Sequence, residues 1–305
     1  MNNYIVLDIG GSSVKHAIIS ENGEFLEKGS YKSEREDFNI FKQNMIDIIN
    51  EAKEKYNVKG VAVSSPGSVN SDTGIIGGIS ALPCIHGPNF KEIFGQDLGL
   101  NLEIENDANC AALGEVWKGA AKDNKDVLFV VCGTGIGGAV IKDKRIHRGN
   151  NLFGGEFGYM VLETKEVNGE RELNVWSDTG STGAILRNFS KLKNLKEEDL
   201  NGKMIFELAE NGDKDAAKII DDFYFNMALG IYNLQYIYDP EKILIGGAIS
   251  SREDFLEKIN EKIDEVIDKV RIAKIAKVNP IIEKCKFKND ANLLGALFNY
   301  LQRNS

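Results

Sequence analysis

The alternation of apolar and polar residues predicts paired strands at two places that follow one plan. Residues 4–20 (YIVLDIGGSSVKHAIIS) contain an apolar strand, a Gly/Ser turn and a second apolar stretch. Residues 126–142 (DVLFVVCGTGIGGAVIK) repeat this order about 120 residues later. The stretch after each turn is short and rich in β-branched residues, so we expect it to be the return strand of a β-hairpin. The spacing is too long for a solenoid repeat and favours two related domains.

Four other segments have the pattern of helices. Apolar residues recur with a 3.6-residue period along residues 37–56 and 252–270, which predicts amphipathic helices. Residues 214–238 are long and mostly apolar, and residues 291–301 are short and apolar. We expect the long helix to be buried between layers. Strands that alternate with helices indicate the α/β class.

The order of these elements predicts two lobes around a cleft. We expect an N-terminal lobe at 1–117, a C-terminal lobe at 118–289, and a C-terminal helix at 290–305 that packs back on the first lobe. No linker rich in Pro, Gly or Ser separates the halves, so the lobes should be closely apposed.

Composition and charge narrow the function classes. The 305 residues are 42% apolar and 27% charged, with a net charge of −9, so no basic stripe is available for nucleic acid or anionic membrane. No apolar run reaches membrane-spanning length, and MNNYIVLDIGG lacks the features of a signal peptide. The 4 cysteines, at 84, 110, 132 and 285, have no metal-type spacing. They are expected to be buried reduced thiols of a cytoplasmic protein.

The stretch GTGIGG, beginning at Gly133, matches the G-x-G-x-x-G pattern of dinucleotide-binding folds. That fingerprint requires a helix after the glycines, within a βαβ unit. Here the glycines precede a predicted strand, so we do not expect a nicotinamide or flavin cofactor. A P-loop is also not expected, because G-x-x-x-x-G-K-[ST] does not occur.

Several loops share one design, an apolar strand that ends in small residues and one polar group. They are DIGGSS from Asp8, SPGS from Ser65, END from Glu105, GTG from Gly133, and Gly246-Gly247. Ligands in α/β folds bind beyond the carboxyl ends of strands, and glycine lets backbone N–H groups approach an anion. Two such loops, one from each domain, would hold a polyphosphate. Asp8 fits beside phosphate if it reaches Mg²⁺, directly or through water.

The motifs LDIGGSSVK, SSPGSVN, IENDANCAALGE, GTGIGGAV, GGEFGYM and ILIGGAIS occur in the order and spacing of one family. Over nearly its whole length the chain resembles the repressor, open reading frame, kinase (ROK) sugar kinases. The resemblance implies the actin-like (hexokinase/ribonuclease H-like) ATPase fold, with ATP and Mg²⁺ as cofactors. The acceptor would be the 6-hydroxyl of a hexose or N-acetylhexosamine.

The resemblance also implies roles for individual residues. Gly10, Gly11, Ser12 and Ser13 would face the γ-phosphate, Gly133, Thr134 and Gly135 would hold the β- and γ-phosphates, and Gly246 and Gly247 would pack against adenosine. Lys15 lies close to the first loop in sequence, where it fits either a phosphate contact or a surface position. Asp107 matches the family's catalytic base. The sugar side would be formed by Asn106, Glu156, Tyr159 and Ser177, with Gly67, Ser68 and Ser80 near hydroxyls.

Two of these positions depart from the family pattern. Tyr159 replaces the usual histidine, and Ser177 replaces a sugar-binding glutamate in a segment that lacks all the zinc cysteines. We therefore expect no zinc, because a structural zinc site needs three or four N/S ligands. Packing around Trp176 would replace the metal.

Simpler interpretations stay open for several residues. Asp107 or Asn106 could serve as the N-cap of the following helix, and Glu156 could be a solvated loop acid. Tyr159 could be a packed aromatic residue that touches no sugar, and His86 is a further residue that could border the sugar pocket.

Alternatives also stay open for the function. The acceptor candidates are N-acetylmannosamine, favoured by the small Ser177, then glucose and β-glucosides. A sugar-sensing ROK regulator is disfavoured because the first strand begins near residue 3 and no basic helix precedes it. A sensor without catalysis is disfavoured because Asp107 and both glycine loops are intact. The apolar long helix is compatible with a homodimer.

Overall fold

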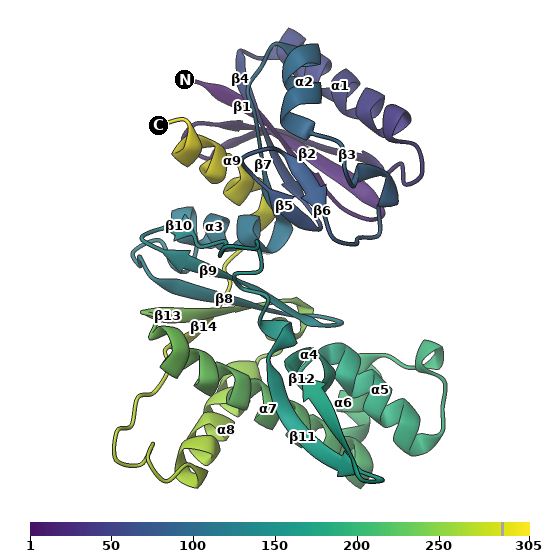
Figure 1. The fold of residues 1–305 in the computed structure, drawn as a ribbon, viewed down its shortest axis with the longest axis vertical. Coiled ribbons are helices and arrows are strands. Elements are labelled where there is room, and N and C mark those ends of the chain that lie inside the picture. The colour runs from purple at the N-terminus through teal and green to yellow at the C-terminus, as the bar shows by residue number, and fades with distance from the viewer. Residues whose placement is uncertain (288–289) are drawn as a thin grey trace. The chain divides into compact units, whose positions relative to one another are not determined.

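The computed structural model describes residues 1–287 and 290–305 of the chain (Figure 1). The chain forms two compact units, each with its own sheet and core. Unit 1 comprises Met1–Asp123, Ile141–Gly154 and Lys286–Ser305, and unit 2 comprises Asn124–Val140 and Gly155–Cys285. The lobes expected at 1–117 and 118–289 have other bounds than these units, because residues 118–123, 141–154 and 286–287 belong to unit 1; residues 288–289 lie outside the described residues.

Unit 1 contains a five-stranded sheet with helices on both faces. Its elements are β1 (Asn3–Ile9), β2 (Ser13–Ser20), β3 (Phe25–Lys32), α1 (Phe38–Lys55), β4 (Val58–Ser65), β5 (Ser68–Asn70), β6 (Ile75–Gly77), a 3₁₀ turn (Pro83–Ile85), α2 (Phe90–Leu98), β7 (Leu102–Asn106), α3 (Asp107–Lys118), β10 (Arg145–Ile146) and α9 (Ala291–Arg303). The strand order is β3-β2-β1-β4-β7, with β1, β4 and β7 parallel. The hairpin β5-β6 forms a separate two-stranded sheet.

The two faces of the unit 1 sheet bury different cores. Side chains of β1, β4 and β7 that alternate along each strand pack on α1 and α2 from one face. The opposite set, which includes Val6 and Ala62, packs on α3 and α9. Figure 1 shows α9 lying along one side of this sheet and α1 and α2 on the other. The last helix therefore completes the core of the unit that contains the N-terminus.

Unit 2 contains most of a mixed sheet of order β10-β9-β8-β13-β14, in which β10 pairs antiparallel with β9, and a group of helices. Its elements are β8 (Val127–Cys132), β9 (Ile136–Lys142, whose last two residues belong to unit 1), a 3₁₀ turn (Phe157–Tyr159), β11 (Val161–Val167), β12 (Glu170–Val175), α4 (Trp176–Thr179), α5 (Thr182–Lys193), a 3₁₀ turn (Glu197–Asp199), α6 (Gly202–Glu210), α7 (Lys214–Tyr238), β13 (Lys242–Gly246), a 3₁₀ turn (Ala248–Ser251), α8 (Phe255–Lys269) and β14 (Ile282–Lys284). Strand β13 pairs in parallel with β8 and β14, and β9 neighbours β8. The helix α7 supplies much of the core, including Phe223 and Met227.

The elements predicted from periodicity are confirmed. The stretch after each glycine turn is a strand, β2 or β9, and β2 pairs antiparallel with β1. Helices α1, α7, α8 and α9 lie at the four predicted segments. The prediction that all four cysteines are buried is wrong for Cys84 and Cys285, which are half-buried, because both lie in connections outside the strands and α-helices.

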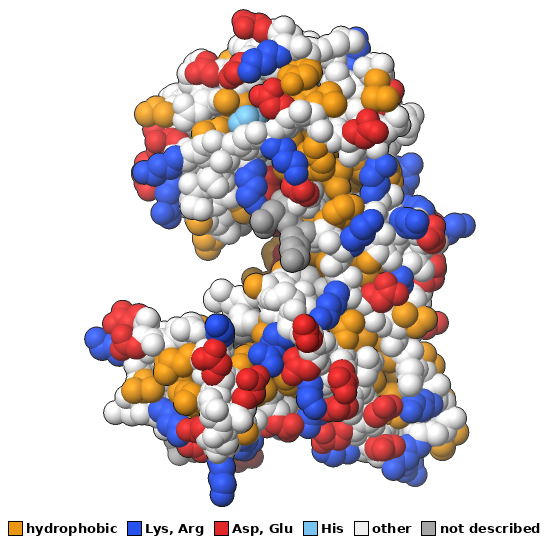
Figure 2. Space-filling view, turned by 180° about the vertical axis from the view of Figure 1, so that it is seen from behind, with side chains coloured by type: hydrophobic (Ala, Val, Ile, Leu, Met, Phe, Trp, Pro, Cys, Tyr) orange, Lys and Arg blue, Asp and Glu red, His pale blue; other side chains and the backbone are white. Residues whose placement is uncertain are grey.

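On the face that Figure 2 shows, acidic and basic side chains lie interspersed over each unit. In the described part of the chain, no helix is both long enough and apolar enough to cross a membrane.

Candidate functional site

A row of polar residues crosses the sheet of unit 1 near the carboxyl ends of three parallel strands. Asp8 of β1 is paired in register with Ser64 of β4, and Ser64 is paired with Glu105 of β7. Residues in register on parallel strands point to the same face, here the face covered by α3 and α9. Polar groups thus replace apolar ones where the strands end.

Asp8 is held rigidly within this row. Its side chain is buried, and its Oδ1 atom accepts hydrogen bonds from Ser64 Oγ (2.8 Å) and from Asn292 Nδ2 of α9 (3.0 Å). Lys15 Nζ, from β2, lies 3.7 Å from Oδ2, and the Lys15 side chain is 42% exposed. Lys15 therefore lies beside Asp8 as an ion-pair partner with its end at the surface.

Asn106 ends β7 and Asp107 begins α3, and we call this junction the Asn106–Asp107 turn. Asn106 is the N-cap of α3, because its Oδ1 accepts from the Asn109 backbone N–H at 3.1 Å. The alternative in which Asp107 is the cap is wrong, since Asp107 is the first helical residue. Freed from capping, the Asp107 carboxylate lies at the amino end of α3, where the helix dipole favours negative charge.

The hydrogen bonds of Asp107 within the described chain all go to one of its two oxygens. Its Oδ1 accepts from the Ala108 backbone N–H (2.8 Å) and from Asn106 Nδ2 (3.0 Å). Among the residues that the structure describes, no donor reaches Oδ2. Burial, and to a smaller extent the negative charge of Asp8, raise the pKa of Asp107 from 3.8 to about 6, against the lowering effect of these hydrogen bonds. The carboxylate is therefore a stronger base than an exposed aspartate.

Of the residues predicted for the sugar side, those in unit 1 lie around the β5-β6 hairpin. Asn106 Nδ2 donates to the Gly67 carbonyl at 3.0 Å, so this loop contacts the Asn106–Asp107 turn. Gly67 has φ +97°, and a Cβ there would meet the Gly77 carbonyl and His86. Ser80 Oγ and His86 Nε2 form a hydrogen bond of 2.8 Å. The structure thus brings Gly67, Ser80 and His86 into one region of unit 1, with Ser68 starting strand β5.

The first glycine loop, residues 10–13, joins β1 to β2. The Gly10 N–H donates to the Ser13 carbonyl (3.1 Å), and Ser33 Oγ donates to the Gly10 carbonyl (2.6 Å). Gly10, Gly11 and Ser13 are half-buried, and Ser12 is exposed. The loop follows Asp8 directly and so lies at the same end of the sheet.

The second glycine loop, in unit 2, is fixed to the amino end of α5. The Gly133 carbonyl accepts from the N–H and Oγ1 of Thr182 (2.9 and 2.7 Å), and the Thr134 carbonyl accepts from Ser181 Oγ (2.9 Å). Ser181 is the N-cap of this helix. The carbonyls are thus turned toward the helix, while Thr134 and Gly135 are exposed. A glycine loop at a helix N-terminus is a favourable place for a phosphate.

The Gly246-Gly247 turn follows β13 in unit 2. Gly247 has φ +98°, and a Cβ there would meet the backbone of Cys132, the last residue of β8. Only glycine fits this position, because the turn passes directly over the neighbouring strand. The turn therefore lies next to the strand that leads into the second glycine loop.

Glu156 and Tyr159 lie on a 3₁₀ turn of unit 2, and both are exposed. Although the residue as a whole is exposed, the protein around the Glu156 carboxyl partly desolvates it and raises its pKa. The interpretation of Tyr159 as a packed aromatic residue is wrong, because Tyr159 is 70% exposed.

Ser177 lies on α4, and its Oγ accepts from the Ile136 backbone N–H at 2.9 Å. A Cβ on Gly135 would lie 3.3 Å from the same oxygen. Ser177 therefore supports the second glycine loop.

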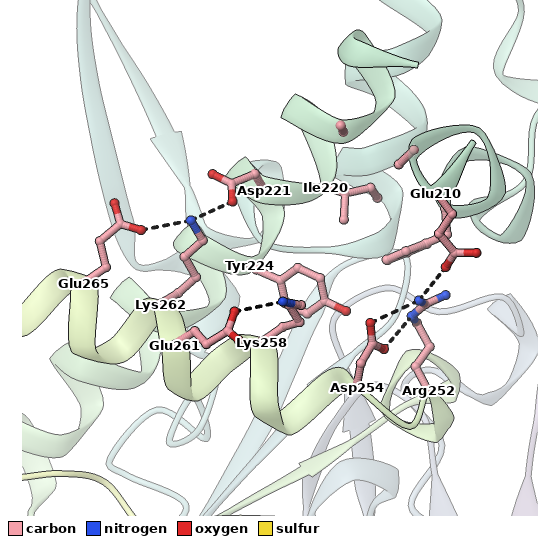
Figure 3. A pocket seen from close by; sticks show the side chains of 13 residues that line it. Glu210, Ile220, Asp221, Tyr224, Arg252, Asp254, Lys258, Glu261, Lys262 and Glu265 are labelled. Atoms are coloured by element: carbon pink, nitrogen blue, oxygen red, sulfur yellow. Dashed lines mark hydrogen bonds and ion pairs between the residues drawn. The ribbon is translucent and has the colours of Figure 1, made fainter. Parts of the chain in front are cut away.

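A cavity of about 500 Å³ in unit 2 lies apart from these groups (Figure 3). It is lined by α6, α7, α8 and the segment before α8, and none of the predicted site residues lines it within the described chain. Its cations are bound by its own acids: Arg252 pairs with Glu210 and Asp254, and Lys262 pairs with Asp221 and Glu265. We assign this cavity no part in the candidate site.

The described side chains show what kind of metal binding is compatible with this site. Among the described residues, no group of three or more His, Cys, Asp or Glu side chains could hold a metal ion. One buried carboxylate next to a phosphate loop, as at Asp8, is compatible with the way Mg²⁺ binds, through few carboxylates, substrate phosphates and water.

Several residues around this site were not predicted from the sequence. Glu105 is fully buried and binds Arg148, and Ser64 and Asn292 bind Asp8. Acids that alternate with apolar residues in LEIEN indicate a buried polar face of β7, which could have drawn attention to Glu105. Arg148 and Asn292 carry no local pattern, because only the fold brings them to the sheet.

Solved structures with this architecture define the class of protein. A ROK family protein from Streptococcus pneumoniae TIGR4, in complex with sucrose, is 34% identical, with a TM-score of 0.87 over 99% of each chain. A ROK family glucokinase from Streptomyces griseus, in complex with glucose and AMPPNP, is 22% identical and shares the fold, with a TM-score of 0.74 over 99% of this chain and 100% of that one. The expected actin-like ATPase fold is confirmed.

Sequence relatives give the family. The sequence profile of the ROK family matches residues 4–303, and the chain belongs to this family. A beta-glucoside kinase from Listeria innocua is 34% identical over 301 residues, which cover 97% of this chain and 96% of the relative.

Proposed function

We propose that the protein is an ATP-dependent sugar kinase in which Asp107 is the catalytic base. The observation that carries this proposal is the environment of Asp107: one carboxylate oxygen is held by two donors, and the pKa is raised to about 6. A general base works best when its pKa lies near the working pH. Membership of the ROK family and the similarity to a beta-glucoside kinase support the reaction class.

In this proposal Asp107 orients the sugar hydroxyl and accepts its proton. The Oδ1 contacts fix the plane of the carboxylate, so Oδ2 can accept a hydrogen bond from the acceptor alcohol. The sugar oxygen then forms a bond to the γ-phosphorus, the bond from that phosphorus to the β,γ-bridging oxygen breaks, and ADP leaves. Phosphoryl transfer depends mostly on positioning and charge stabilisation, so a single well-oriented carboxylate is sufficient for the protein's part.

The nucleotide would be bound by the residues around the two glycine loops. Gly133, Thr134 and Gly135 at the amino end of α5 are suited to the β- and γ-phosphates, and Gly246 and Gly247 to adenosine. Gly10 to Ser13 would face the γ-phosphate. Asp8 would hold Mg²⁺ through water, since its Oδ1 already accepts two hydrogen bonds; when bound, this ion neutralises phosphate charge. ATP as the donor fits a cytoplasmic location.

Two acceptors are supported by different observations, and in both the 6-hydroxyl would be phosphorylated. The similarity to a beta-glucoside kinase favours a β-glucoside. The small Ser177 in place of a glutamate favours N-acetylmannosamine, although the Ser177 hydroxyl is engaged with Ile136. Asn106, Glu156 and Tyr159 would contact the sugar.

A substrate panel tests the proposal. ADP release is measured with MgATP and each of N-acetylmannosamine, N-acetylglucosamine, glucose and a β-glucoside, and the ratio of kcat/KM values ranks the acceptors. We expect sugar-dependent turnover with one of them, and the product's phosphate position is read by NMR. If the protein binds sugar but shows no turnover, the proposed kinase function is wrong and a sugar sensor is the better interpretation.

A further inference from the structure

Glu105 is a fully buried acid one residue before the Asn106–Asp107 turn. Its exposure is 0%, because β7 brings it to the face of the sheet that α3 and α9 cover. Burying a carboxylate without partners is costly, so its position requires specific donors. The proposed function gives Glu105 no part in the reaction.

The donors around Glu105 come from three separate segments of the chain. Its Oε2 accepts from Ser71 Oγ (2.8 Å) and from Arg148, through Nε at 2.8 Å and through Nη2. Its Oε1 accepts from Asn109 Nδ2 and from the Asn106 backbone N–H, both at 2.9 Å. All these residues belong to unit 1, and five hydrogen bonds fix the carboxylate in one orientation.

Arg148 reaches this network from a distant part of the sequence. It follows β10 in the segment Ile141–Gly154, and its carbonyl accepts from the Gly154 N–H at 2.9 Å, which closes a compact loop. Its Nη2 also donates to Asn299 of α9 at 3.4 Å. The side chain is 26% exposed, so the pair is largely shielded from water. A guanidinium fork is suited to such a carboxylate.

The network continues directly to Asp107. Glu105 accepts hydrogen bonds from the Asn106 backbone N–H and from the Asn109 side chain. Asn109 in turn donates its backbone N–H to Asn106 Oδ1. The Asn106 amide then donates from Nδ2 to Asp107 Oδ1. Each bond in this series lies within 3.1 Å. A rotation of the Glu105 carboxylate would therefore move the Asn106 amide and with it the plane of the Asp107 carboxylate.

We propose that Glu105 and Arg148 form a positioning pair that holds the Asn106–Asp107 turn in the geometry that the base requires, an inference that rests on the proposed kinase function. Stability alone does not explain an ion pair here, because replacing a buried ion pair by apolar residues is often neutral or stabilising. An apolar residue at 105 could not bind the Asn106 N–H or the Asn109 amide. The pair also ties the loop of Arg148 to the turn of Asp107.

Changes in the charge of Glu105 or Arg148 should shift the pKa of Asp107 and therefore the pH profile of kcat. The neighbouring ionisable groups are Asp8 of β1, Lys15 of β2, which pairs with Asp8, Cys110 of α3, and the Glu105–Arg148 pair itself. Removing the guanidinium leaves the charge of Glu105 uncompensated, which disfavours the ionised form of Asp107. Removing only the Glu105 charge has the opposite sign.

The test compares Arg148→Met, Arg148→Lys, Glu105→Gln and the double variant Glu105→Gln/Arg148→Met in the full chain. We expect Arg148→Met to lower kcat by about 10²-fold with the KM for ATP within about twofold, because misplacement of a catalytic group has effects of this size. Arg148→Lys should recover part of the loss. The acid limb of the kcat profile should move to higher pH in Arg148→Met and to lower pH in Glu105→Gln, and return in the double variant. Arg145→Met, on the exposed strand β10, is the matched control and should match the wild type.

The inference is overturned if folded Arg148→Met retains kcat within twofold of the wild type, or if its loss equals its unfolded fraction with an unmoved acid limb. If Arg148→Met does not fold, the same criteria are applied to Arg148→Lys and to the uncharged double variant. Titration of the Asp107 carboxyl ¹³C resonance, assigned with Asp107→Asn, reports the same pKa shifts without turnover. A wild-type chain that phosphorylates no sugar would therefore refute the proposed function. The titration would still test whether Glu105 and Arg148 control the pKa of Asp107.

Discussion

The Asn106 amide nitrogen lies 3.0 Å from Asp107 Oδ1 and 3.0 Å from the Gly67 carbonyl oxygen. One side chain thus links the β5-β6 region to the carboxylate proposed as the base. Its other end caps α3, so the helix terminus, the loop and the carboxylate are fixed together. A carboxylate that is already fixed loses little conformational entropy when it orients a substrate hydroxyl. Phosphoryl transfer requires such orientation.

Replacing the base should separate catalysis from binding. We expect Asp107→Asn to lower kcat by about 10²-fold or more while ATP still binds, because the amide keeps the oxygen that accepts from Ala108 and cannot accept a proton. Stopped-flow turnover and calorimetric titration with a non-hydrolysable ATP analogue measure the two effects. Asp97→Asn, at a surface ion pair with Lys42, is the control. Near-normal turnover in Asp107→Asn would remove Asp107 from its role.

The raised pKa of Asp107 predicts an acid limb in the activity. The base must be ionised, so kcat/KM should fall about tenfold per pH unit below pH 6, where the pKa lies. A profile between about pH 5 and pH 9 measures the limb. An aspartate of ordinary pKa would instead stay active to about pH 4, and such a profile would contradict the environment described for Asp107.

The same shift predicts an effect on stability. Because the folded-state pKa is raised from 3.8 to about 6, the ionised carboxylate costs folding free energy above pH 6 and costs none below about pH 3.8. Asp107→Asn should therefore be more stable than the wild type at pH 7.5, by an amount on the order of 2 kcal/mol, with the difference disappearing in acid. Urea unfolding at several pH values measures it. A pH-independent difference would argue against this origin.

Crowding the second glycine loop should weaken nucleotide binding. A Cβ at Gly135 lies 3.3 Å from Ser177 Oγ, so the branched side chain of Gly135→Val would be forced toward the exposed side of the loop. We expect the KM for ATP to rise at least about tenfold with the KM for sugar little changed, since a lost charge-assisted contact to phosphate has this order of effect. Gly137→Val, two residues on, meets nothing within 4 Å and is the matched control. An unchanged KM for ATP would mean that this loop does not hold phosphate.

Packing around Trp176 should stabilise the segment that a structural zinc ion would otherwise hold. Trp176 is fully buried on α4, and its ring lies against the backbone of Gly230 on α7. Trp176→Ala should cost about 3–5 kcal/mol of unfolding free energy, measured in urea, because it leaves a large cavity. Chelators should leave the wild-type melting temperature unchanged, and metal analysis should find no zinc. Stoichiometric zinc in the purified protein would refute this interpretation.

Local patterns foretold the parts of the fold that depend on neighbours in the chain. The strand after Gly135 and the helices α1, α7 and α8 follow from periods of two and 3.6 residues. Whether Asn106 or Asp107 caps α3 could not be read from the sequence, because both side chains can cap a helix. The exposure of Tyr159 was also missed, because an aromatic residue between apolar neighbours has the same local pattern whether it packs or not.

By itself the sequence determined the α/β class, the two glycine loops, the family and the identity of the proposed base. Tertiary structure alone decided the environment of that base. Asp8, Glu105, Asn292 and Arg148 are far apart in the chain, and only strand register and the packing of α3 and α9 bring them to one end of a sheet. The pKa of Asp107 depends on burial and on those neighbours, and both are consequences of folding that no local pattern encodes.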